Sequence, residues 1–96
     1  MKVVVRQAVI KSIDEIAEHI IHAVKMPDTA LRYADKLIKF GNELGKSPYA
    51  HALCRDLKLA ENKFRCAVFD KKWIFVYKVS STHVVIHRLV WGGLVK

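Results

Sequence analysis

The apolar residues of this chain change their spacing partway along it, and this change restricts the possible folds more than any other feature. In the first half they recur every three or four positions, as one face of an α-helix requires. After Asn62 they alternate with polar residues or form short runs, as in β-strands. The 96 residues are enough for one compact core but not for two. We therefore expect residues 1–96 to form a single α+β domain.

The first part of the sequence predicts one strand followed by a helix. Residues 2–6 are rich in valine, a β-branched residue that favours strands. The helix is expected to begin at Ala8, or at Ser12 if Ser12 and Glu15 form a capping box. Pro27 ends it, because proline cannot continue the hydrogen bonding of a helix.

A second helix is expected from Asp28 or Thr29 to about Gly45, antiparallel to the first. Residues 47–62 carry a weak pattern that fits a short helical turn. Three strands with short turns between them then indicate an antiparallel meander: residues 64–69, 73–79 and 83–91. This β-α-α-β-β-β order predicts a helix hairpin packed on one face of a mostly antiparallel four-stranded sheet.

The whole chain has a net charge of +8, and most of this positive charge lies in its second half. Residues 1–48 hold eight Lys/Arg against six Asp/Glu, whereas residues 49–96 hold nine against three. Such a field attracts polyanions or acidic proteins. No apolar run approaches the roughly 18 residues of a membrane span, and Met1–Val5 is not followed by a signal cleavage site. We expect a cytoplasmic protein that does not contact the membrane.

Neither a metal site nor a disulfide is indicated. Cys54 and Cys66 lie twelve positions apart without a CxxC motif, so we expect two free thiols. His19 and His22 would share a metal only if further ligands converged on them. We therefore expect no metal and no cofactor.

Several motifs follow one another along nearly the whole chain. They are Ala8 after the first strand, Pro27 and Ala30 in the second helix, Leu44 and Pro48 after it, Arg65 in a strand, the aromatic-rich strand Ile74–Val79, and Ile86 to Arg88. Their order and spacing resemble the RelE/ParE superfamily of toxins from type II toxin–antitoxin systems. The long helix hairpin is more similar to ParE. The ending Gly92–Lys96 lacks both the terminal tyrosine of RelE and the arginine-rich tail of ParE.

The resemblance implies a toxin of a plasmid-stabilisation module that arrests growth until an antitoxin neutralises it. ParE-like toxins inhibit DNA gyrase, and the hairpin favours this activity. RelE-like toxins instead cleave messenger RNA on the ribosome, and a non-toxic or decayed module that only binds antitoxin is a third alternative. In each case the resemblance implies an acidic antitoxin that forms a hetero-oligomer with the chain.

Candidate site residues come from the basic second half. Cleavage of RNA without a metal requires a base for the 2′-hydroxyl, stabilisation of a phosphorane and an acid for the leaving oxygen. For this chemistry the candidates are Arg65, His87 and Arg88. For contact with gyrase, or with the ribosome and its message, the candidates are Arg65, Lys71, Lys72, Lys78, Arg88 and Trp91. A strict period of two places His83, His87 and Trp91 on one face of the last strand, and Arg88 on the other with Val84 and Ile86.

Overall fold

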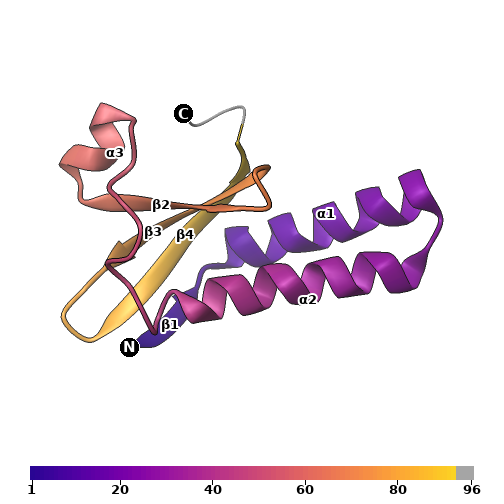
Figure 1. Cartoon of the computed structure of the whole chain (residues 1–96), viewed down its shortest axis with the longest axis horizontal. Helices are drawn as coiled ribbons and strands as arrows, with labels where there is room; N and C mark the ends of the chain where they lie inside the picture. Colours follow the sequence, from indigo (N-terminus) through magenta and orange to yellow (C-terminus); the bar gives the residue numbers. More distant parts are fainter. Residues whose placement is uncertain (93–96) are drawn as a thin grey trace.

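The computed structural model describes residues 1–92 and contains the predicted elements in the predicted order (Figure 1). In chain order they are β1 (Lys2–Val5), α1 (Gln7–Val24), α2 (Pro27–Glu43), α3 (Leu57–Glu61), β2 (Phe64–Phe69), β3 (Trp73–Val79) and β4 (His83–Trp91). The expectations for the ending after Gly92 lie outside the described residues. None of the helices within residues 1–92 is long and apolar enough to cross a membrane.

The strands described within residues 1–92 form one sheet in the order β1-β4-β3-β2. Strand β1 pairs in parallel with β4, and the β2–β3 and β3–β4 pairs are antiparallel. The prediction of a mostly antiparallel sheet built on a meander is confirmed. Strand β3 lies inside the sheet, as expected for a strand with apolar residues on both faces.

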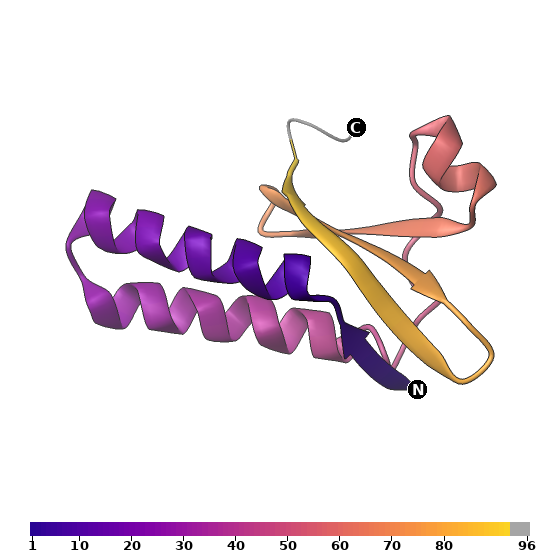
Figure 2. The same cartoon turned by 180° about the vertical axis from the view of Figure 1, so that it is seen from behind.

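The α1–α2 hairpin packs on one face of the sheet and encloses the main core. The largest fully buried side chains of this core are Tyr77, Phe75, Leu37, Ile86, Val9 and Val84. Gly41 allows α2 to approach the sheet closely, because a Cβ there would lie 3.2 Å from Cδ1 of Ile86 and 3.3 Å from a ring carbon of Phe75. Figures 1 and 2 show that the tip of the hairpin projects well beyond the sheet.

The helix starts differ slightly from the predictions. Helix α1 begins at Gln7 after an extended Arg6, so the alternative start at Ser12 is wrong. The Ser12 hydroxyl donates to the carbonyl oxygen of Ala8 (3.0 Å) inside the helix and therefore caps no N–H group. Helix α2 begins at Pro27, a residue favoured in a first turn because its missing N–H would have no partner there.

A second, smaller apolar cluster lies on the sheet face opposite the hairpin, which we call the open face. Cys54, Ile74 and Val76 are buried in it. Residues packed against them include Leu59 of α3 and Phe64 and Cys66 of β2. Helix α3 thus covers part of the open face.

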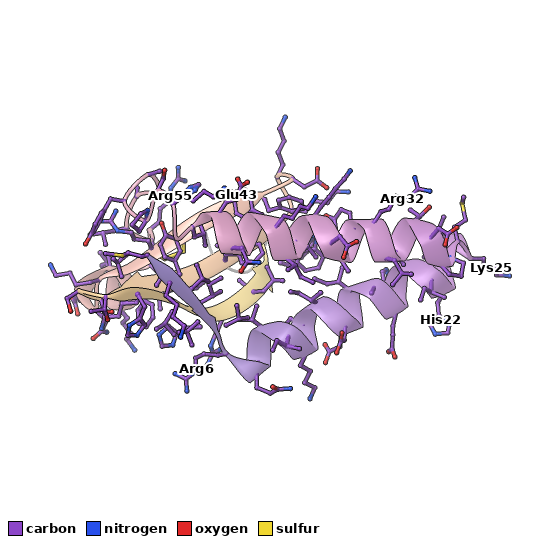
Figure 3. All side chains as sticks on the ribbon, turned by 90° about the horizontal axis from the view of Figure 1, so that it is seen from below. Arg6, His22, Lys25, Arg32, Glu43 and Arg55 are labelled. Carbon is purple, nitrogen blue, oxygen red and sulfur yellow. A yellow bond between two sulfur atoms is a disulfide. The ribbon has the colours of Figure 1, made fainter. Side chains whose placement is uncertain are left out.

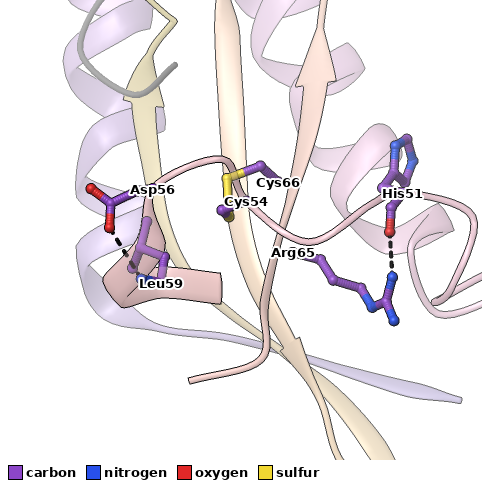
Figure 4. The surroundings of a disulfide bond; sticks show 6 residues. All are labelled: His51, Cys54, Asp56, Leu59, Arg65 and Cys66. Atoms are coloured by element: carbon purple, nitrogen blue, oxygen red, sulfur yellow. Dashed lines mark hydrogen bonds between the residues drawn. A yellow bond between two sulfur atoms is a disulfide. The ribbon is translucent and has the colours of Figure 1, made fainter. Parts of the chain in front are cut away.

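Cys54 and Cys66 form a disulfide within this cluster, so the expectation of two free thiols is wrong (Figure 4). The segment before α3 runs beside β2: the Cys54 N–H donates to the carbonyl oxygen of Phe64 (3.0 Å) and the Cys66 N–H to that of Ala52 (3.3 Å). This pairing brings the two cysteine Cα atoms within 4.9 Å. The cysteine spacing did not indicate it, because residues 52–54 lack the pattern of a strand.

Candidate functional site

A β-bulge in β4 brings two consecutive residues to the open face of the sheet. Val76 pairs with Arg88 and Tyr77 with Ile86, so His87 has no partner on β3. In a regular strand, neighbouring side chains point to opposite faces, and the extra residue of a bulge resets this alternation. Arg88 therefore lies on the face of Val76, and the expectation that it shares a face with Ile86 is wrong.

Arg6, Lys78, His87 and Arg88 form a cluster on the open face, which we call the His87 patch. Arg6 follows β1 directly, and its N–H donates to the carbonyl oxygen of Ile86 (3.1 Å), which fixes it beside His87. Its guanidinium lies 3.3 Å from Nδ1 of His87. Figure 3 shows Arg6 at the base of α1, far from the hairpin tip.

The half-buried ring of Phe64 joins the patch from β2. It stands edge-on to the ring of His87, with 4.9 Å between the centroids. The ammonium of Lys78 lies 5.3 Å from the centroid of the same ring, as in a cation–π contact. Two side chains of the patch, those of His87 and Lys78, thus contact an aromatic ring on the open face of the sheet.

His87 is held neutral by its surroundings. Burial lowers the pKa of its imidazole, and the neighbouring charges of Arg6, Lys78 and Arg88 lower the pKa further. Because a guanidinium only donates, Nδ1 of His87 accepts the hydrogen bond from Arg6 and the ring proton is on Nε2. The patch therefore combines three cations with a neutral N–H donor, a set of groups suited to an anion.

Arg65 lies on the hairpin face of the sheet, because it pairs with Tyr77. Its guanidinium donates to the carbonyl oxygen of His51 (2.7 Å), as Figure 4 shows, and lies 4.9 Å from the centroid of the Tyr49 ring. These contacts hold the loop that follows α2. Arg65 is thus separated by the sheet from His87 and Arg88, and the three residues predicted for RNA cleavage are not brought together.

The other predicted contact residues lie in different places. Lys71 lines a pocket of about 520 Å³ beside the disulfide. Lys72 and Trp91 line a groove on the hairpin side, and Lys78 belongs to the His87 patch. The strict period of two had placed Trp91 on the same face as His87, and this prediction is wrong. The bulge at His87 shifts the alternation, so that the two side chains lie on opposite faces.

The groove that Trp91 lines runs between α1 and the ends of β3 and β4, and we call it the α1 groove. Its volume is about 630 Å³. Its apolar lining consists of Ile16, Ile20, Trp73, Leu89, Val90 and Trp91. Trp91 is 56% exposed at its rim, and such an aromatic is a favourable anchor for a protein partner.

Histidines on α1 do not assemble a metal site in the described structure. Within residues 1–92, no three His, Cys, Asp or Glu side chains converge as metal ligands. His19 lines the α1 groove, and His22 lies near the hairpin tip (Figure 3).

A solved structure shares this fold across nearly the whole chain. The chain is similar to one from the "Chromosomal ParDE TA system from P. aeruginosa", with a TM-score of 0.79, 14% sequence identity and 95% of each chain covered. No family model and no curated sequence matches the chain. The structural similarity establishes a RelE/ParE-like fold, as the resemblance in sequence had implied.

Proposed function

We propose that the chain is the toxin of a type II toxin–antitoxin module of the plasmid-stabilisation type, acting in the cytoplasm on DNA gyrase. The fold shared over 95% of both chains with a member of a ParDE toxin–antitoxin system carries this proposal. The hairpin of 18 and 17 residues supports a ParE-like activity. The separation of Arg65 from His87 and Arg88 counts against the arrangement proposed for RNA cleavage.

The surface is suited to an acidic antitoxin. Apolar side chains of an antitoxin segment would fill the α1 groove against Trp91, and its carboxylates would pair with cations such as Lys72 at the rim. A net charge of +8 would accelerate the encounter of the two proteins. The neutralised form would then be a toxin–antitoxin hetero-oligomer whose antitoxin segment folds on binding.

The test is to express the chain alone and together with an acidic reading frame that neighbours its gene. We expect growth arrest with loss of plasmid supercoiling, relieved by the neighbouring protein. The purified chain should also inhibit supercoiling by gyrase, and addition of the purified neighbour should restore it.

Other outcomes would select the alternatives. Arrest with normal supercoiling and with messages cut inside translated codons would replace gyrase inhibition by ribosome-dependent cleavage. Harmless expression, combined with binding to the acidic neighbour, would identify a non-toxic antitoxin-binding module and contradict the proposed toxin.

A further inference from the structure

We propose that the pocket beside the Cys54–Cys66 disulfide receives a small thiol that carries carboxylates, as glutathione does, and that this thiol opens the disulfide by exchange. We call this the disulfide pocket, and its volume of about 520 Å³ lies in the range of small-molecule sites. Its lining includes both cysteines and the cations Arg55 and Lys71. The inference concerns the chemistry of this pocket and does not depend on the proposed toxin activity.

The position of the disulfide favours a small thiol over a protein. Exchange requires a thiolate to reach one of the two sulfur atoms. Cys54, in the segment before α3, is only 4% exposed, and Cys66 on β2 is half-buried (Figure 4). A small molecule can enter the disulfide pocket and reach Cys66 there, whereas the active site of a protein dithiol needs a sulfur atom at an open surface.

The charges at the disulfide pocket favour a negatively charged thiol. Arg55 directly follows Cys54, Lys71 lies in the turn between β2 and β3, and both side chains are exposed. Among residues 1–92, the lining of this pocket contains no Asp or Glu. The carboxylate of the adjacent Asp56 accepts a hydrogen bond from the N–H of Leu59 (3.1 Å) at the start of α3. The two cations therefore raise the local concentration of an anionic thiol.

The rest of the disulfide pocket is suited to the carbon skeleton of such a molecule. Leu53 and Val68 line it while remaining 41% and 54% exposed, and the buried side chain of Ile74 lies at its base. Contact with a ligand would remove this apolar surface from water. A peptide-like thiol, with methylene groups between its charged ends, can use the apolar and the cationic side chains together.

The exchange proceeds in two steps at Cys66, the more exposed of the two cysteines. The thiolate attacks Sγ of Cys66 and forms a new S–S bond, and Cys54 leaves as a thiolate that takes a proton from water. A second thiolate then attacks the sulfur of the bound thiol and releases Cys66. Two small thiols are thereby oxidised to their disulfide, and the protein disulfide gains two electrons and two protons.

The test measures the rate at which the purified chain is reduced by glutathione, mercaptoethanol and cysteamine, whose thiolates carry decreasing negative charge in that order. Each rate constant is divided by that of the same thiol with an uncharged small disulfide, so that differences in nucleophilicity cancel. We expect a preference for glutathione over cysteamine of about tenfold at low salt, most of which disappears at about 1 M salt. Mass spectrometry should find the mixed disulfide on Cys66.

The decisive comparison uses two double variants of equal net charge. Arg55→Gln with Lys71→Gln removes both cations of the disulfide pocket, and Lys36→Gln with Lys39→Gln removes two exposed cations from α2. The first pair should reduce the preference for glutathione by about fivefold, and the second by less than about twofold. Circular dichroism would confirm that both variants fold.

Three results would overturn the proposal. The first is an equal normalised rate for the three thiols, which would show that the disulfide pocket does not select an anion. The second is an equal loss of preference in the two double variants, which would reduce the effect to net charge. The third is rapid reduction by a thioredoxin-type protein dithiol, unchanged in the pocket variant and without any preference for glutathione, which would assign the disulfide to a protein partner.

Discussion

The hydroxyl of Tyr77 donates a hydrogen bond to the carbonyl oxygen of Pro48 over 2.8 Å and thereby ties β3 to the loop that follows α2. The ring of Tyr77 is completely buried in the main core. Burial raises the pKa of this hydroxyl, so it keeps its proton and remains a donor near neutral pH. Together with the bond from Arg65 to His51, this contact closes one end of the core.

Tyr77→Phe should therefore destabilise the fold without changing its shape. The variant keeps the buried ring but leaves the carbonyl oxygen of Pro48 without its partner, which costs about 1 kcal/mol. Urea denaturation measures the loss. Tyr49→Phe, which keeps the ring beside Arg65 at a position 63% exposed, is the matched control and should be unchanged. Equal stability of wild type and Tyr77→Phe would contradict this role.

The disulfide should contribute strongly to stability. Cys54 and Cys66 close a short loop, and cross-links of about this length stabilise small domains by about 3 kcal/mol. Reduction with dithiothreitol should lower the thermal unfolding midpoint of the wild type. The double variant Cys54→Ala, Cys66→Ala should start from a lower midpoint and be insensitive to the reductant. A reductant effect of the same size in both proteins would show that it does not arise from this bond.

The order of elements and the sheet were predictable because apolar spacing is a local property. The strands at residues 64–69, 73–79 and 83–91 coincide with β2, β3 and β4, since tight turns separate three clearly alternating or apolar runs. The apolar residues on both faces of β3 also indicate its central place in the sheet. Each of these features can be recognised within a window of about ten residues.

The candidate site was only partly predictable because it depends on long-range pairing. Arg6 reaches His87 through the parallel pairing of β1 with β4, 81 positions apart in sequence. The bulge that places Arg88 on the open face has no signal in the sequence, and a strict period of two assigned that residue to the wrong face. Phe64 was recognised as a strand residue, but its contact with His87 depends on the same tertiary arrangement.

His87 should titrate below the usual histidine value of about 6.5. Its pKa is lowered in the folded protein, so between that lowered value and about 6.5 the unfolded chain binds more protons, and stability falls as the pH falls. NMR titration of the ring protons gives the pKa directly. Arg6→Gln removes one of the charges that oppose protonation and should raise the pKa. A His87 that titrates at or above the ordinary value in the wild type would contradict the described electrostatics.

Gly41 should resist replacement by larger residues. The nearest atoms of Ile86 and Phe75 already lie 3.2 and 3.3 Å from the position of an added Cβ, so the extra methyl groups of Gly41→Val would overpack the core. Such changes cost about 1–3 kcal/mol, measurable by urea denaturation. Asn42→Val places the same β-branched residue at the next, exposed position of α2 and should cost much less. Similar losses in the two variants would show that the close approach is unimportant.

Trp91 should be an anchor for the antitoxin if the proposed function is correct. It is exposed at the rim of the α1 groove, and truncating such an aromatic in the centre of an interface costs about 2 kcal/mol or more, or about a 30-fold rise in Kd. Isothermal titration of Trp91→Ala with the acidic neighbouring protein measures the change. Leu57→Ala removes an apolar side chain that is 77% exposed on α3, outside the groove, and should bind normally. If Trp91→Ala also binds normally, the antitoxin does not occupy the α1 groove at Trp91, because a partner seated there buries the ring.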